Sequence, residues 1–424
     1  MQLVEQHRIR RSDPRFAAID QAAFAAKNLY NLANYHVRQS FIHEGTYLSY
    51  VEVFRRVKSH EAYTALPRKV SNAILIQLHR NWLSFFAAIK AYRADPSQFT
   101  GRPKLPNYKD KTKGRFLLVY EKKALGKRLF GTTGKLAPSG LSIEVATKRQ
   151  WDEIIQVRIV PCALEYRVEV VYEQVERTAQ ETGVNHQLVA ALDLGVNVLG
   201  ALTSNKPGFL PRVASGKVLK SINQFFNKQR AQEQSHLAHE NSSQTRRTSR
   251  HLEQITTKRN RRINAILHTA SRRIIDLLVA EGIGTLVIGK NPLWKQAVHL
   301  GRKHNQEFVQ IPHARFIEML TYKARLVGIV VVLQEESYTS KASFLDDDPL
   351  PTYDSAHPAQ YRFSGKRVTR SWYEARDGRV IHADVNGSYN ILRKWQQSSA
   401  SNSNPWQVGR GVAGAAVHPR RLAV

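Results

Sequence analysis

Cysteine is nearly absent from this sequence, because Cys162 is the only one in 424 residues. A single thiol excludes a disulfide scaffold, an iron–sulfur cluster and any zinc site built from several thiolates. Long hydrophobic runs are also missing: no stretch approaches 18 consecutive apolar residues, and the N-terminal MQLVEQHRIRR reaches charge before a signal-peptide core could form. We therefore expect a protein of a reducing compartment that is neither secreted nor inserted in a membrane.

Acidic residues are scarce as well. The chain has 34 Asp and Glu against 64 Lys and Arg, which gives a formal net charge of +30. Such an excess is typical of proteins that neutralise phosphates, so nucleic acid is the expected partner. With 42% hydrophobic residues the chain can still form sizeable cores, and its length predicts two to four structural units.

Helical periodicity dominates the first hundred residues. After a first β segment at 1–15, apolar side chains recur every three or four positions through 16–42 and again from Ile74 to Ile89. We interpret the second, aromatic stripe as helix packing rather than base stacking, because stacking platforms need exposure. The sequence thus predicts a helical region over 16–100.

Short β-type runs between Gly, Pro and basic residues follow over 101–180 and predict a small β-barrel or sheet lobe. The polar stretch 176–187 is interpreted as a linker. Over 187–395 the pattern changes to α/β, with apolar strands at 285–289 and 328–337 on either side of a helix, which predicts a parallel pair. The tail 396–424 has low complexity and is expected to be flexible.

A basic helical insertion is predicted over 217–280. Acidic partners at helical spacing are almost absent there, which favours a phosphate-contacting face over an ordinary solvated one. The basic candidates for nucleic-acid binding in this insertion are Arg246, Arg247, Arg250, Lys258, Arg259, Arg261 and Arg262.

Acidic side chains stand at strand ends or helix starts of the α/β region: Asp193, the adjacent Glu335 and Glu336, and Asp384. Carboxylate oxygens are the ligands that Mg²⁺ prefers, and such clusters hydrolyse phosphodiesters with two metal ions. Taken singly, each acid could equally be a turn residue, an exposed strand end or a helix cap.

The order of motifs removes much of this ambiguity. The chain resembles the transposon-encoded TnpB family, relatives of the type V CRISPR effector nucleases and of the Fanzor proteins, over about residues 15–395. The segments that carry the resemblance are LYNLANYHVRQSF, FTGRPKLPNYK, ALDLGVNVLGALTS, IGTLVIGKN, ESYTSK and DVNGSYNILRK. The last four, in this order, are typical of an interrupted RNase H-like nuclease domain of the RuvC type.

Two departures from the family pattern concern the site. Most TnpB proteins carry their second acid at the end of the strand that corresponds to TLVIG, where this chain has Gly289. The resemblance to Fanzor proteins moves that role to a glutamate before YTSK. We prefer Glu336 over Glu335, because strand alternation lets only one of the two face Asp193. The alternative is a nuclease-dead binder.

The second departure is the zinc ribbon of the family. Residues 342–383 contain no cysteine, and His357 and His382 alone make a poor structural zinc site, so we expect no zinc. A small aromatic core is expected in place of the metal. Its predicted members are Phe344, Tyr353, Tyr361, Phe363, Trp372 and Tyr373.

The resemblance implies an α+β multidomain protein: a helical recognition lobe inserted in a β-barrel wedge lobe, then a RuvC-like domain with Asp193, Glu336 and Asp384 holding two Mg²⁺ ions. It implies a Mg-dependent, RNA-guided DNA endonuclease of the bacterial cytoplasm near the nucleoid. Its partners would be a transposon-end guide RNA, bound by one protein chain, and a double-stranded DNA target with its displaced strand.

Further nucleic-acid contacts are expected from Arg102, Lys104 and Lys109 in GRPKLPNYK and from Lys341 in YTSK. Two other functions stay open. One is a guide-directed repressor that does not cleave, and the other is a conventional transposase that acts on the ends of its own element.

Overall fold

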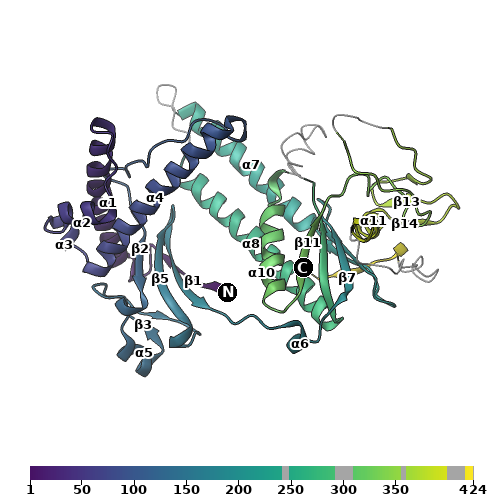
Figure 1. Ribbon diagram of the computed structural model, residues 1–424, viewed down its shortest axis with the longest axis horizontal. Helices are drawn as coiled ribbons and strands as arrows, with labels where there is room; N and C mark the ends of the chain where they lie inside the picture. The colour runs from purple at the N-terminus through teal and green to yellow at the C-terminus, as the bar shows by residue number, and fades with distance from the viewer. Residues whose placement is uncertain (241–247, 292–308, 355–359, 399–415, 424) are drawn as a thin grey trace. The chain divides into compact units, whose positions relative to one another are not determined.

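The computed structural model describes residues 1–240, 248–291, 309–354, 360–398 and 416–423. Two compact units divide the chain, Met1–Gln174 and Val175–Val424 (Figure 1). Three residues considered above, Arg246, Arg247 and His357, lie outside the described ranges.

Helices form one part of the first unit. They are α1 (Phe16–His43), α2 (Tyr50–Val57), α3 (Glu61–Thr64), α4 (Arg68–Ala94) and the separate α5 (Lys127–Thr133). Pro67 precedes α4, as its fixed φ and missing N–H favour at a helix start. Trp82 of α4 is fully buried, and its Nε1 donates to Asn34 Oδ1 of α1 at 3.0 Å. The two long helices are therefore joined by packing and by a buried hydrogen bond.

An antiparallel sheet forms the other part. Its order is β1 (Gln2–Arg10), β6 (Glu165–Glu173), β5 (Ile154–Pro161), β2 (Leu118–Glu121), so the helices α1 to α4 are inserted between two strands of one sheet. Of the two expected forms, the barrel is wrong and the sheet is confirmed, because β1 and β2 are the edges of an open sheet. The chain between β2 and β5 forms α5 and the two-residue strands β3 (Lys135–Leu136) and β4 (Val145–Ala146) instead of further barrel strands.

A six-stranded mixed sheet is the centre of the second unit. Its order is β11 (Val330–Gln334), β10 (Ile283–Gly289), β7 (Asn185–Asp193), β8 (Val198–Ser204), β9 (Arg212–Ser215), β15 (Arg420–Leu422). Strands β7, β8 and β9 are antiparallel neighbours, while β10 joins β7, and β11 joins β10, in parallel. The predicted parallel pair is confirmed.

Helices pack on both faces of this sheet. The helices of the unit are α6 (Ala179–Thr182), α7 (Lys217–Glu240), α8 (Arg250–Ala280), α10 (His313–Arg325) and α11 (Ala383–Ser398). Leu192 and Ile288 pack in one hydrophobic cluster with α8 and α10, whereas Ala191 and Val287 pack with α11. Successive strand residues thus point to opposite layers.

Three expectations need correction here. The end of the chain is not flexible throughout, since Arg420–Leu422 form β15 and pair in parallel with β9. The expected linker contains α6 and the first residues of β7. The expected aromatic core is incomplete: Phe344 and Tyr373 are buried, but Tyr353 and Tyr361 are 56% and 42% exposed, and Tyr361 packs instead against Tyr338 with ring centroids 5.1 Å apart.

The remaining strands are β12 (Lys366–Arg367), β13 (Trp372–Glu374) and β14 (Val380–His382), which form an antiparallel sheet. The turn between β13 and β14 contains Gly378 with φ of +82°, as the Asp-Gly pair predicts. In the described ranges, no helix has both the length and the apolar composition needed to cross a bilayer.

Candidate active site

The carboxyl ends of three parallel strands share one edge of the six-stranded sheet. Asp193 ends β7, Gly289 ends β10, and Glu336 follows two residues after β11. Ile288 pairs with Leu192, and Gly289 pairs with Gln334, so Gly289 lies between the ends of the two acid-bearing strands. In open α/β sheets this edge is where ligands bind.

Helix α11 approaches Asp193 very closely. Asp193 has the same strand parity as Ala191, whose side chain packs toward α11. A Cβ atom at Gly387 of α11 would lie 2.6 Å from Asp193 Oδ2, so only glycine fits there without displacement. The first turn of the same helix carries Asp384. Gly387 is a residue that the sequence reasoning missed, although its place within DVNG could have indicated it.

Three polar side chains of α11 fasten the segment that carries Glu336. Asn386 Nδ2 donates to Ala342 O at 2.8 Å, and Asn390 Nδ2 donates to the same oxygen and to Thr339 O at 2.9 Å. Lys394 Nζ donates to Ser337 O at 3.0 Å. These donors recur every four residues on one helix face, which is a signal the sequence did contain.

The adjacent glutamates differ sharply in their surroundings. Glu335 is paired with Lys394, and its Oε1 accepts from Ser337 N at 2.6 Å. Burial opposes ionisation of Glu335, but these hydrogen bonds prevail and lower its pKa. For Glu336, burial and the neighbouring charge of Glu335 raise the pKa to about 7. The charge of Glu335 is thus compensated by Lys394. Glu336 is the acid that lies at the edge where the parallel strands end.

Electrostatic strain links the three predicted acids. Burial raises the pKa of Asp193 well above its usual range, and the negative charges of Glu336 and Asp384 raise it further. Burial also raises the pKa of Asp384, although His382 and Arg367 oppose the shift. The Arg367 Nη2 lies 3.6 Å from Asp384 Oδ1. The structure therefore brings Glu336 and Asp384 within electrostatic reach of Asp193.

These acids fit divalent metal ions in kind. Three clustered carboxylates whose ionisation is suppressed by burial and mutual repulsion are the arrangement that a hard cation relieves. The oxygens are not converged, however: among the described residues, no three His, Cys, Asp or Glu side chains meet closely enough to hold a metal.

A basic cavity of about 1100 Å³ opens beside Asp384. Its wall includes the turn from Gly195 to Val198, between β7 and β8, and the hairpin residues Trp372 and His382. Four cationic side chains line it: Lys217, Arg367, Arg370 and Arg421. Arg421 comes from β15, so the strand that the sequence analysis missed contributes to the site.

The predicted nucleic-acid residues of α8 fall into two groups. Arg250, Lys258 and Arg262 are exposed, as phosphate contacts require. Arg259 instead donates from Nε to Asn223 Oδ1 at 2.8 Å and from Nη2 to Gln310 O at 3.0 Å. Its guanidinium is engaged inside the unit, which disfavours the predicted contact. Arg261 is only partly exposed.

The other basic candidates are exposed as well. Arg102, Lys104 and Lys109 are exposed in the first unit, and Lys341 is exposed in the YTSK segment. His382, considered above for zinc, lies 3.9 Å from Asp384 Oδ2 through its Nδ1. The absence of zinc stays a prediction.

Models of known protein families match the two segments of the chain that carry the acids. Residues 166–294 match OrfB_IS605, a family described as a probable transposase, and residues 313–391 match the Cas12f1-like TNB domain. The TnpB-like protein ORF457 of Acidianus two-tailed virus is 24% identical over 402 residues, which cover 86% of this chain and 80% of that protein. The chain belongs to the TnpB family. Its OrfB_IS605 match contains Asp193 of this TnpB sequence, and its TNB match contains Glu336 and Asp384.

Among solved structures, this TnpB chain is similar to the protein of a Cas12f1–sgRNA–target DNA complex, with a TM-score of 0.49 and 12% identity over 88% of this chain and 81% of that one. It is also similar to C2c1 of Alicyclobacillus acidoterrestris in complex with single-guide RNA, with a TM-score of 0.42 and 10% identity over 90% and 70% of the two chains.

Proposed function

We propose that the protein is an RNA-guided DNA endonuclease encoded by a transposon, with an RNase H-like domain of the RuvC type. The observation that carries this proposal is that Glu336 and Asp384, from distant parts of a TnpB-family chain, lie within electrostatic reach of Asp193. A cavity lined with cations opens beside Asp384. Acids that could hold metal and cations that could hold phosphate are the two requirements of phosphodiester hydrolysis.

The acids would hold two Mg²⁺ ions, which when bound would supply an activated water and stabilise the leaving oxygen. Gly289 and Gly387 make room for Glu336 and Asp193 at the reacting end of the sheet. Arg370 and Arg421 would contact the phosphates of the strand to be cut, and Arg367 would release Asp384 when that strand enters. These contacts would orient the scissile phosphate toward the three carboxylates.

Specificity would come from a guide RNA derived from the transposon end. Pairing between guide and target strand reads sequence, while the protein contacts backbones through its basic surfaces. Arg250, Lys258 and Arg262 on α8 are the exposed candidates for guide contacts. The first unit would read a short motif beside the double-stranded target, and the displaced strand and target strand would be cut in the same site.

Sequencing of the nucleic acid that copurifies with the full-length chain tests the first half of this proposal. One RNA species with a constant scaffold is expected, and absence of a dominant RNA would favour a conventional transposase. Cleavage of a plasmid that carries the matching target tests the second half. Mg²⁺-dependent cleavage should disappear in Asp193→Ala and persist in a control at the exposed Asp377, Asp377→Asn. Guided binding without any cleavage by the unmodified chain would favour a repressor.

A further inference from the structure

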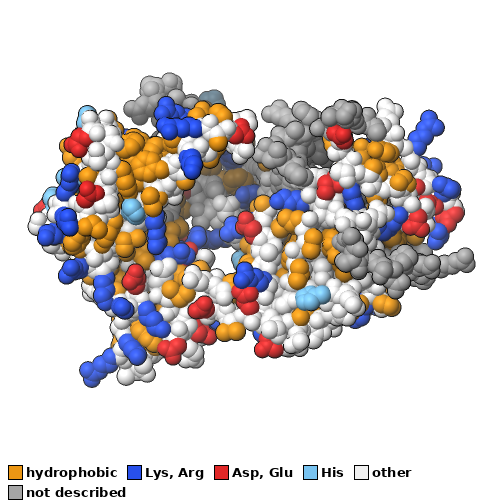
Figure 2. All heavy atoms as spheres, in the orientation of Figure 1, with side chains coloured by type: hydrophobic (Ala, Val, Ile, Leu, Met, Phe, Trp, Pro, Cys, Tyr) orange, Lys and Arg blue, Asp and Glu red, His pale blue; other side chains and the backbone are white. Residues whose placement is uncertain are grey.

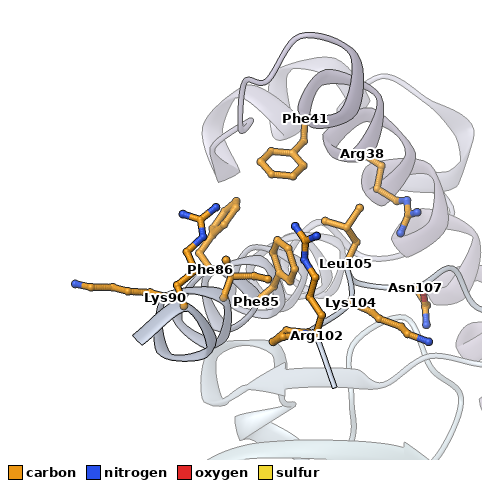
Figure 3. Close-up of a pocket in the computed structure, with 12 residues that line it drawn as sticks. Arg38, Phe41, Phe85, Phe86, Lys90, Arg102, Lys104, Leu105 and Asn107 are labelled. Carbon is orange, nitrogen blue, oxygen red and sulfur yellow. The ribbon is translucent and has the colours of Figure 1, made fainter. Parts of the chain in front are cut away.

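A cavity of about 930 Å³ lies in the first unit, between the C-terminal parts of α1 and α4 and the chain that follows α4. Its size is typical of sites that take small organic groups. One wall is aromatic: Phe41 of α1 contacts Phe86 of α4 with ring centroids 5.6 Å apart, and Phe85 lies 5.4 Å from Phe86. In Figure 3 Phe41 points from α1 toward Phe85 and Phe86.

The rim of this cavity is cationic. Five of its twelve lining residues carry positive charge and none is acidic. The five are Arg38, Lys90, Arg93, Arg102 and Lys104. Figure 3 shows Arg102 and Lys104 extending from the segment after α4 and Lys90 extending outward from α4. A polyanion would therefore be attracted from more than one side.

Packing alone does not account for the aromatic wall. Trp82, one turn earlier on α4, is fully buried and is bonded to Asn34 of α1. Phe85 and Phe86 are only partly buried, and their faces border the cavity. The expected packing stripe therefore divides in two: its first part to Trp82 forms core, and its continuation through Phe85 and Ile89 borders open space. Figure 2 shows hydrophobic side chains with Lys and Arg beside them over this part of the unit.

We propose that this cavity binds an unpaired nucleotide of a single-stranded nucleic acid, with the base against Phe85 and Phe86 and the flanking phosphates on the cationic rim. Partly exposed aromatic faces next to cations are the combination that single-strand binding uses, since every base has a π-face and every linkage a charge. Asn107, at the edge of the cavity, offers an amide for a base edge. An acidic peptide would match the rim but would leave the aromatic wall unused.

This site is independent of the proposed nuclease function, because it needs none of the three acids. Its test uses the full-length chain, freed of copurified nucleic acid in high salt, and ten-nucleotide single strands that carry one 5-iodouracil. Irradiation cross-links 5-iodouracil to aromatic side chains against which it stacks, and mass spectrometry identifies the cross-linked peptide. Cross-linking at Phe85 or Phe86 is expected. An RNA arm and a DNA arm, run separately, identify which strand the site takes.

Affinity supplies the second readout. Base stacking on an aromatic side chain changes affinity by about 5- to 150-fold. Phe85→Leu keeps bulk but removes the ring, so it should lower affinity for a base-bearing strand at least fivefold and leave affinity for an abasic strand of equal length unchanged. Phe85→Tyr should retain binding. Leu83→Ala, at an exposed position of α4 outside the cavity, is the matched control.

Several results would overturn the proposal. One is that neither the RNA arm nor the DNA arm gives cross-linking at Phe85 or Phe86. Another is that Phe85→Leu loses affinity equally for base-bearing and abasic strands. A third is that an acidic peptide displaces the base-bearing strand as effectively as nucleic acid does. Thermal unfolding of Phe85→Leu separates loss of binding from loss of fold, and Phe86→Leu, at the other ring of the aromatic wall, repeats the comparison if Phe85→Leu unfolds. In the cross-linking and affinity measurements Asp193→Ala should give the same results as the unmodified chain, whether or not the unmodified chain cleaves DNA.

Discussion

Glu336 Oε2 occupies the space that a side chain at Gly289 would need, because a Cβ atom built at Gly289 would overlap it. Ile391 of α11 closes the same space from the other side. The edge between β10, β11 and α11 therefore has room for one acid and not two. A carboxylate at the end of β10 and one after β11 are alternatives for the same volume, which gives a physical basis for the proposed relocation.

Exchange of the two residues tests this relationship. Loss of second-sphere groups at metal sites costs about 10- to 100-fold in activity, so Glu336→Ala, which removes a proposed ligand, should lower target cleavage by more than about 100-fold. The double variant Gly289→Asp with Glu336→Gly should recover part of the activity, because the carboxylate returns to the same volume from the neighbouring strand. Glu335→Gln should have a milder effect. Full cleavage by Glu336→Ala would show that the relocation is wrong.

Asn390 positions the Glu336 segment without belonging to the acid cluster. Asn390→Ala removes two hydrogen bonds to backbone oxygens of a buried turn, and we expect a destabilisation of about 1–3 kcal/mol. Cleavage should fall together with the melting temperature, while RNA binding persists. Thr269→Ala, which removes an exposed hydroxyl bonded within α8, is a control that should change neither. Unchanged cleavage in Asn390→Ala would contradict the positioning role.

Lys323 should make stability depend on pH. Burial lowers its pKa to about 8, although its Nζ donates to His268 O at 2.7 Å. The folded pKa lies below the unfolded value of 10.5, so between pH 8 and 10.5 the unfolded chain binds more protons and the unfolding free energy rises with pH. Below pH 8 the cost of the buried charge is fully present.

Calorimetry of Lys323→Met checks this sign. The melting temperature of the unmodified chain, relative to that of Lys323→Met, should rise between pH 7.5 and 9.5. A constant or falling difference over this interval would contradict the assignment.

The two groups of basic residues on α8 predict different phenotypes. Replacing the exposed Lys258 and Arg262 by Gln should reduce the steepness of the dependence of log affinity for RNA on log salt by about 1 to 2, one counterion-releasing contact for each residue. Arg259→Gln should instead lower the melting temperature, because its bonds to Asn223 and Gln310 are lost. The reverse assignment of phenotypes would show that α8 presents a different face to RNA.

Arg421 connects the end of the chain to the cavity beside Asp384. Arg421→Gln should weaken cleavage about tenfold through loss of one charged phosphate contact, with the deficit smaller at higher salt because salt screens that contact. Guide RNA binding should be unchanged. The exposed Arg379, which is paired with Asp377 in a hairpin turn, provides the control Arg379→Gln. Equal cleavage by Arg421→Gln and the unmodified chain would remove Arg421 from the proposed substrate path.

Local patterns in the sequence predicted much of this architecture. Periodicity indicated the long helices, and apolar runs ending in acid indicated the strands that bring Asp193 and Glu336 to one edge. The partner of β9 was not predictable, because Arg420–Leu422 is a three-residue strand after a low-complexity stretch and has no periodicity of its own. Arg259 was misjudged for a related reason: its contact with Gln310 joins residues far apart in the chain, and composition does not reveal such a partner.

The pairing of β1 with β6 has a consequence for synthesis of the chain. Every residue from Gln2 to Arg10 lies opposite a residue between Glu165 and Glu173 in the antiparallel ladder. At translation rates of about 5–20 residues per second, roughly 8–30 s separate the emergence of the two strands. During that interval β1 has no partner, while α1 to α4 already have the residues for their mutual packing. Charged side chains along the unpaired β1, such as Glu5, Arg8 and Arg10, disfavour its pairing with the nascent chains of neighbouring ribosomes.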